Sequence, residues 1–412
     1  MSARAEAPSP RYAGAQIITA RRLAILGMGL APVALWLTLP PLTLDTVAAP
    51  LILGAVSALL GVAAITRGEP RVGWGAVASG VLAIGAGVLA VQASASNLKE
   101  VITWSTLISL GLAFATPLIF AAIGGLFSER SGVVNIGLEG MMLMGAFFGA
   151  WGADATGSWF GGLLIAMLSG GLLALVHAVF SINLRADQIV TGTAIIFLAY
   201  GITGYLYNDI YGTAGTPPVL PEIPVVDLDF LGSVPPEGLG DFLQKSFGDL
   251  SLMTWIAFAL VVLTSIFMFR TSWGLRVRSV GEHPRAADTV GISVYRVRYA
   301  CVTLSGILAA MGGAFLSIGY AHSFTEKMTA GKGFIALAAL IFGAWRPYGA
   351  LAACLLFGLS TAFSPQLQNV EAWASYGQLF EALPYLLTIV VVAGVIGRSI
   401  PPAAIGRPYV KQ

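Results

Sequence analysis

Charge is what this sequence of 412 residues has least of, since Asp, Glu, Lys and Arg together make up 10% of it. A soluble domain carries about 25% charged residues, which cover its surface. Hydrophobic residues make up 57% of the chain. This composition excludes a soluble globular fold and predicts an integral membrane protein. The net charge of +2 gives no indication of nucleic-acid binding.

Cysteine and histidine are also rare, with two and three residues. Cys301 and Cys354 lie in apolar stretches, and no disulfide framework or zinc pattern is present. His177, His283 and His322 have neither metal spacing nor a partner for a catalytic dyad. Phosphate-binding and hydrolase motifs are missing too. We therefore expect no catalytic residue, metal or cofactor, and no enzyme activity in this chain.

Long apolar runs dominate the sequence, and most approach the ~20 residues that a helix needs to cross a bilayer. The expected fold is all-α, a polytopic transmembrane bundle of about 11–12 helices. The candidate spans are residues 23–40, 50–66, 72–92, 102–126, 133–153, 158–180, 188–208, 251–269, 299–321, 333–346, 347–364 and 377–397. The run 333–346 is too short to cross alone unless the bilayer thins or the backbone re-enters. The 50 glycines favour close helix packing.

Composition divides the chain into four parts. Residues 1–20 are polar and predicted to be a disordered cytoplasmic N-terminus. Residues 21–100 hold three bland apolar spans, interpreted as an accessory bundle. These three spans have no polar cluster, whereas the spans of the core, 101–397, contain polar and ionisable residues, so function is expected there. Residues 398–412 form a tail.

The orientation follows from the loops. The segment Arg270–Arg298 carries six arginines and two acids, and arginine-rich short loops stay on the cytoplasmic side. Counting spans from it places both termini inside. The segment 209–250, with seven acids and one lysine, falls outside. Lys327 and Lys332 are exceptions to the rule, because both fall outside.

An internal repeat is suggested by two segments, 135–151 and 331–345, which share a glycine-rich start and an identical FGAW end. By the span count they run in opposite directions. Inverted repeats with interrupted helices are typical of transporter cores, with the substrate at the repeat interface. A chance match between apolar sequences is the alternative.

Polar candidates for a substrate path lie in both segments. Asn135 and Glu139 are four residues apart and would share a helix face. A carboxylate facing lipid costs at least ~2.5 kcal/mol, so Glu139 is expected to face protein or a water-filled path. The alternative is a helix-end glutamate that caps or pairs with Arg130. Phe334, in the second segment, could stack on a planar ligand or serve in packing.

Further path candidates are Thr116, Gln188 and Thr191. Thr116 precedes Pro117, which is expected to kink its helix, and the hydroxyl could satisfy the carbonyl that the proline leaves free. Gln188 and Thr191 open a span after Asp187. They could line a path, but an N-terminal cap at Asp187 explains this pattern equally well.

Three segments, 128–147, 274–294 and 331–350, resemble permease subunits of bacterial ABC importers. They are most similar to the nucleoside branch of the ribose/branched-chain amino acid permease superfamily, over about 102–397. The resemblance implies a permease in the bacterial cell membrane that imports its substrate by alternating access. It also implies three partners: a cytoplasmic ATPase, a paralogous second permease and an extracellular substrate-binding lipoprotein that could contact 209–250.

The resemblance further implies that the arginine-rich segment inserts a short helix into the ATPase. Pro284 can start this helix and Gly291 can end it. His283 stands where the family pattern has asparagine. The expected coupling residues are Gly281, Glu282, His283, Pro284, Ala286, Ala287, Gly291 and Ile292. The alternative is an ordinary solvated loop.

Three other functions stay open at this point. Within the same class, the substrate could be a simple sugar or a branched-chain amino acid. In a different class, the chain could be a gradient-driven transporter acting alone. The coupling segment argues against the last, because a solo carrier has no use for it.

Overall fold

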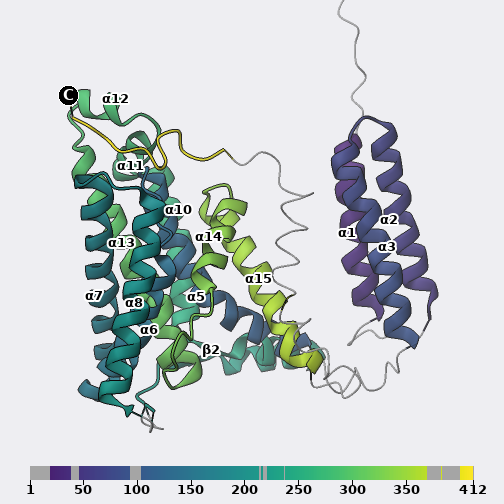
Figure 1. Ribbon diagram of the computed structural model, residues 1–412. Coiled ribbons are helices and arrows are strands. Elements are labelled where there is room, and N and C mark those ends of the chain that lie inside the picture. Colours follow the sequence, from purple (N-terminus) through teal and green to yellow (C-terminus); the bar gives the residue numbers. More distant parts are fainter. Residues whose placement is uncertain are drawn as a thin grey trace, which may run out of the picture. The chain divides into compact units, whose positions relative to one another are not determined.

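The computed structural model describes residues 19–38, 46–92, 104–212, 215–216, 220–235, 237–368, 382 and 400–411 (Figure 1). The chain forms two compact units that divide near Val101. The expected N-terminal tail, apart from its last two residues, and nearly all of the span 377–397 lie outside the described residues.

The first unit consists of three helices, α1 (Ala20–Thr38), α2 (Ala48–Thr66) and α3 (Pro70–Gln92), and each packs on the other two. Close approach of α2 and α3 requires glycine, because a Cβ at Gly54 would lie 2.8 Å from the Gly80 carbonyl oxygen. An accessory role for this unit stays a prediction.

The second unit is a bundle of long helices. They are α5 (Trp104–Arg130), α6 (Leu138–Thr156), α7 (Trp159–Ala178), α8 (Gln188–Ile210), α10 (Leu252–Arg270), α13 (Val294–Ala314) and α15 (Pro347–Gln368). Short helices α9 (Glu237–Leu243), α11 (Ser272–Glu282), α12 (Pro284–Thr289) and α14 (Lys332–Phe342) connect or flank them. Among the described residues of the whole chain, seven helices are long and apolar enough to cross a membrane, namely α2 of the first unit and α5, α7, α8, α10, α13 and α15 of the second. The all-α polytopic prediction is therefore confirmed.

Among the described residues, strands occur only in and directly after the acidic segment 209–250. There β1 (Val225–Asp227) pairs antiparallel with β2 (Asp249–Ser251), so that Asp227 lies opposite Asp249. A hydrogen bond with the Asp229 side chain, with smaller contributions from desolvation and repulsion, raises the pKa of Asp227. The described part of this segment is thus folded and rich in acidic side chains.

Helix α14 is the short span of the sequence prediction. Its 11 residues extend about 16 Å at ~1.5 Å per residue, well below the ~30 Å of a hydrocarbon core. The loop before it reaches the interior, where Thr329 is fully buried. After α14 the chain turns sharply through Ala344 and Trp345, both with positive φ, into α15. This geometry favours the re-entrant interpretation.

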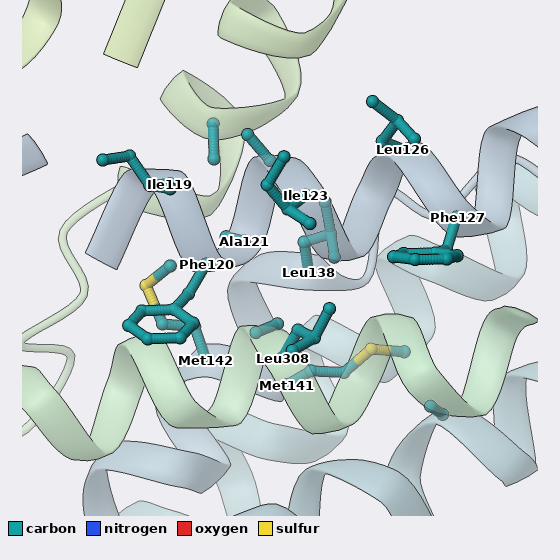
Figure 2. Packing of buried hydrophobic residues seen from close by; sticks show 14 of the residues in the cluster. Ile119, Phe120, Ala121, Ile123, Leu126, Phe127, Leu138, Met141, Met142 and Leu308 are labelled. Carbon is teal, nitrogen blue, oxygen red and sulfur yellow. The ribbon is translucent and has the colours of Figure 1, made fainter. Parts of the chain in front are cut away.

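The core of the second unit gathers around α5 and α13. In their most apolar stretches 72% and 78% of residues are buried, against 28% in α8. Ile123 of α5, Leu138 and Met141 of α6, and Leu308 of α13 belong to one cluster of buried side chains (Figure 2). Helices α6 and α13 touch backbone to backbone, since a Cβ at Gly313 would collide with the Met142 carbonyl. The abundance of glycine thus serves the close packing that the composition predicts.

Candidate substrate path and coupling region

A non-helical break of seven residues separates α5 from α6 inside the second unit. Backbone groups in such a break need partners, because lipid and apolar side chains offer none. Gln188 Oε1 accepts from the Val134 N–H at 2.7 Å, and His177 Nε2 lies 3.1 Å from the Val134 carbonyl oxygen. Ser128 Oγ donates to the Val133 carbonyl at 2.7 Å. Polar side chains from α5, α7 and α8 therefore satisfy the backbone groups of this non-helical segment.

Asn135 lies in this break and not in a helix. Because α6 begins at Leu138, the prediction that Asn135 and Glu139 share a helix face is wrong. Both side chains are nevertheless fully buried. Asn135 Nδ2 donates to Ser305 Oγ on α13 at 3.0 Å, while Oδ1 has no hydrogen-bond partner among the described residues. The amide oxygen is thus a buried acceptor whose hydrogen-bonding capacity is not satisfied by the described residues.

Glu139 accepts three hydrogen bonds from the entrance of α14. Its donors are Thr329 Oγ1 at 2.6 Å and the backbone N–H groups of Gly331 and Gly333 at 2.9 and 2.7 Å. Gly331 is the N-cap position of α14 and has no side chain to cap the helix. Glu139 therefore supplies the cap from a different helix. A Cβ at Gly333 would lie 2.5 Å from the Glu139 nitrogen, so the contact requires glycine there.

The alternative partner for Glu139, Arg130, is engaged elsewhere. Its guanidinium donates twice to the Trp345 carbonyl, at 2.7 and 2.9 Å, and lies 6.0 Å from the Phe269 ring centroid. The indole N–H of Trp345 donates in turn to Glu129 at 2.5 Å. The structure therefore does not support the Glu139–Arg130 pairing.

Two helix N-termini meet at Glu139, which sits in the first turn of α6 and caps α14. Each N-terminus carries roughly half a positive charge, which a buried carboxylate offsets. Lys332 and Tyr200 are close enough to interact electrostatically with Glu139. We call Asn135, Glu139, Ser305, Thr329 and Lys332 the central polar cluster.

Gln188 and Thr191, the two path candidates at the start of α8, make different contacts. Asp187 accepts from the N–H groups of Ile189 and Val190 at 2.8 and 3.1 Å, which confirms the cap. The Thr191 hydroxyl donates to the Asp187 carbonyl of its own helix. Gln188 holds the break before α6. A path role for Gln188 and Thr191 stays a prediction.

Thr116 makes a contact between helices. Its hydroxyl donates to the Leu112 carbonyl at 2.8 Å and lies 2.9 Å from Thr254 Oγ1 of α10. The bonded carbonyl is not the one that Pro117 leaves free, so that part of the prediction is wrong. Phe334 is 45% exposed in the first turn of α14. Path roles for Thr116 and Phe334 also stay predictions.

The sequence gives no signal for several residues that the structure adds to this site. Thr329 is separated from Glu139 by 190 positions, and Ser305 from Asn135 by 170. Both are small hydroxyl residues without a local motif. His177 stands in an apolar helix, where an isolated histidine is ordinarily a packed one.

The short helix predicted to insert into the ATPase has the bounds that the sequence predicts. Helix α12 begins at Pro284, and the left-handed Gly291, with φ of 86°, ends the turn that follows it. His283 makes no side-chain cap. Val290 is 75% exposed, which is a large exposure for a valine on a helix end. The helix thus presents an apolar tip.

The eight expected coupling residues differ in access. Glu282, His283, Ala286 and Gly291 are exposed, whereas Gly281 and Ala287 are buried. A Cβ at Gly281 would collide with the Arg130 carbonyl. Pro284 and Ile292 are half-buried. The two buried residues therefore serve the packing of the segment, and the other six are accessible to a partner.

The C-terminal segment 400–411 packs on this region (Figure 1). The Ala404 N–H donates to the Gly281 carbonyl at 2.9 Å, and the Ala403 N–H to Glu282 Oε2 at 3.1 Å. The buried Arg298 donates to the Arg407 carbonyl at 3.1 Å. The C-terminal tail therefore packs on the predicted coupling segment and is hydrogen-bonded to it.

Comparison with known proteins gives consistent results. The sequence model of a family described as the branched-chain amino acid transport system / permease component matches residues 107–392. The guanosine ABC transporter permease protein NupQ of Bacillus subtilis is 42% identical over 315 residues, covering 74% of this chain and 97% of NupQ. The nucleoside ABC transporter permease protein NupC of Lactococcus lactis is 39% identical over 324 residues, covering 76% of this chain and 100% of NupC. No solved structure matches.

Proposed function

Because the chain belongs to the family of permease components of branched-chain amino acid transport systems, we propose that it is the membrane-spanning subunit of an ATP-driven nucleoside importer. Two similar proteins, matched over almost their whole length, are named as guanosine and nucleoside permeases. The observation that carries the proposal is the central polar cluster, built where two helices begin inside the bundle.

The charge of this cluster favours an uncharged substrate. In transporters with broken helices, helix N-termini inside the membrane commonly bind an anionic group of the substrate. Here the chain's own Glu139 occupies the N-terminus of α14 through Gly331 and Gly333. An amino acid carboxylate or a phosphate would compete with Glu139. A nucleoside has no such group, and its base and hydroxyls can bond to amide and hydroxyl side chains such as Asn135 and Ser305.

The mechanism we propose is alternating access driven by a separate ATPase. The ATPase would bind α12 through its exposed face, with Val290 entering an apolar groove. A paralogous permease would complete the path, and an extracellular lipoprotein would deliver the substrate, with the acidic segment 209–250 as a candidate contact. Both termini would be cytoplasmic, in a bacterial plasma membrane.

The test is uptake into vesicles that contain this chain with its ATPase, second permease and binding protein. Labelled guanosine and adenosine are compared with ribose, leucine and guanosine monophosphate. We expect ATP-dependent accumulation of the two nucleosides only. Uptake of ribose or leucine alone would keep the permease and overturn the substrate. Uptake without the ATPase would overturn the importer.

The docking assignment has its own test. Replacing Val290 by Glu should weaken ATPase binding at least tenfold, because it places a charge in an apolar contact. The exposed Val225, in β1, is the matched control, and Val225→Glu should leave ATPase binding unchanged. Equal ATPase binding by the wild-type chain and Val290→Glu would show that α12 does not dock there.

A further inference from the structure

An apolar cavity of about 300 Å³ lies between α5, α10, α11 and α13. It is separate from the central polar cluster. Phe127, Phe267, Ala300 and Leu304 form part of its wall, and every lining side chain except Arg296 is hydrophobic. The two phenylalanine rings pack at 5.7 Å between centroids.

The cavity lies where membrane-spanning helices end. Helix α10 ends at Arg270 and α13 begins at Val294, and α11 lies between them in the chain. Helix α11 exposes Trp273 and Leu275, at 58% and 59%, while its opposite side is buried. Tryptophan and exposed apolar groups beside arginines are typical of the boundary between headgroups and acyl chains. The cavity therefore opens at the membrane surface.

Positive charge gathers at this opening. Arg296 lines the cavity and is exposed, and Arg276 stacks its guanidinium over the Trp273 ring at 5.0 Å. Within the described ranges, no carboxylate pairs with either arginine. Two guanidinium groups beside an apolar cavity call for a ligand with a negative group joined to a hydrophobic chain.

We infer that this cavity binds one anionic phospholipid, with an acyl chain between α10 and α13 and the phosphate on Arg296 and Arg276. Basic pockets between membrane helices bind anionic lipid headgroups by the same chemistry. An acidic side chain of a partner protein would satisfy the arginines but would leave the apolar wall uncovered. The inference does not depend on the transported substrate.

The test is native mass spectrometry of the full-length chain, titrated in detergent with phosphatidylglycerol or phosphatidylcholine. We expect one phosphatidylglycerol to stay bound and phosphatidylcholine to be lost. Arg296→Gln and Arg276→Gln should each weaken binding about fivefold, as expected for one basic side chain at a membrane surface. Arg185→Gln, which removes an exposed arginine in the connection between α7 and α8, is the charge-matched control and should bind normally.

Cavity filling tests the acyl chain separately. Ala300→Trp and Leu304→Trp keep both arginines and should abolish retention of the lipid. Competition by glycerol 3-phosphate would show that a free phosphate is enough and would overturn the lipid assignment. Equal retention of phosphatidylcholine, or normal phosphatidylglycerol binding by the arginine and tryptophan variants, would also overturn it. Arginine variants that bind lipid normally but lose the ATPase would identify a protein contact.

Discussion

The two units of the chain differ in the polar side chains that they bury between their helices. In the first unit one polar side chain is buried among the described residues, Ser57. Its hydroxyl lies 2.7 Å from the Gly27 carbonyl oxygen and 3.0 Å from that of Ala76, on the two neighbouring helices. The second unit buries amide, carboxylate, imidazole and guanidinium groups, including Glu139 and Arg298.

This difference is what we expect if the second unit carries the transport function and the first unit is accessory to it. Buried polar groups in a membrane are costly and persist where a function uses them. The family match begins at residue 107, after the first unit, and about three quarters of the chain covers nearly the full length of NupQ and NupC. The first unit, whose described residues bury one polar side chain, thus lies outside the matched region.

The largest effect is expected at Glu139. Glu139→Ala leaves the Gly331 and Gly333 N–H groups without their acceptor, at roughly 1–3 kcal/mol each. We expect uptake to fall at least about tenfold with the protein still present in the membrane, measured by vesicle transport and immunoblot. Glu139→Gln removes the charge and keeps one acceptor oxygen, so it retains only part of the cap, because its amide NH2 faces a donor where the second oxygen accepted.

Two results would change this comparison. Unchanged uptake in Glu139→Ala would remove Glu139 from the transport function. If Glu139→Gln were fully active while Glu139→Ala was not, the helix cap would matter and the negative charge would not. The argument for an uncharged substrate would then lose its basis.

A smaller effect is expected from Gly333→Ala, which inserts a methyl group 2.5 Å from the Glu139 nitrogen. Overpacking of this kind costs typically 1–3 kcal/mol, and here it would push α14 away from α6. We expect a lower thermal midpoint and reduced uptake. The control is Gly201→Ala in α8, where the added Cβ meets nothing within 4 Å. Equal midpoints for the two variants would contradict the close contact.

Gln188 and Thr191 should separate in the next test, although the sequence presents them as a pair. Gln188→Leu leaves the half-buried Val134 N–H without its acceptor, at a cost of up to roughly 1–3 kcal/mol, so the thermal midpoint should fall. Thr191→Val removes only a bond within its own helix and should be nearly neutral in thermal melting. If Gln188→Leu melted at the wild-type temperature, the α5–α6 break would not depend on Gln188.

The sequence predicts span ends well where a charge or a cap marks them. Helix α8 starts at Gln188 after the Asp187 cap, and α10 stops at Arg270. The start of α6 is missed by five residues, because Val133 and Val134 continue an apolar run that is not helical. Hydropathy reports depth in the membrane, and it carries no information on whether the backbone there forms a helix.

The central polar cluster could be predicted only in part. Glu139 and Asn135 stand out because a polar residue in an apolar run is costly, whatever the fold. Their partners Thr329 and Ser305 do not stand out, since serine and threonine occur widely in membrane helices. Which hydroxyl meets which carboxylate depends on how α14 re-enters the bundle, and no local pattern of residues encodes that path.

The smallest effect is expected in the first unit, from Ser57→Ala. The serine is fully buried, but its two acceptors are helix carbonyls, which keep their backbone partners when the hydroxyl is removed. Hydrogen bonds between membrane helices contribute about 0.6 kcal/mol on average, so the melting midpoint should shift slightly and nucleoside uptake should not change. Ser305→Ala, which removes the buried partner of Asn135, is the matched control in the second unit and should reduce uptake. If Ser57→Ala abolished uptake while the protein remained in the membrane at its normal level, the first unit would take part in transport. Buried polar side chains would then no longer distinguish the unit that transports from the unit that does not.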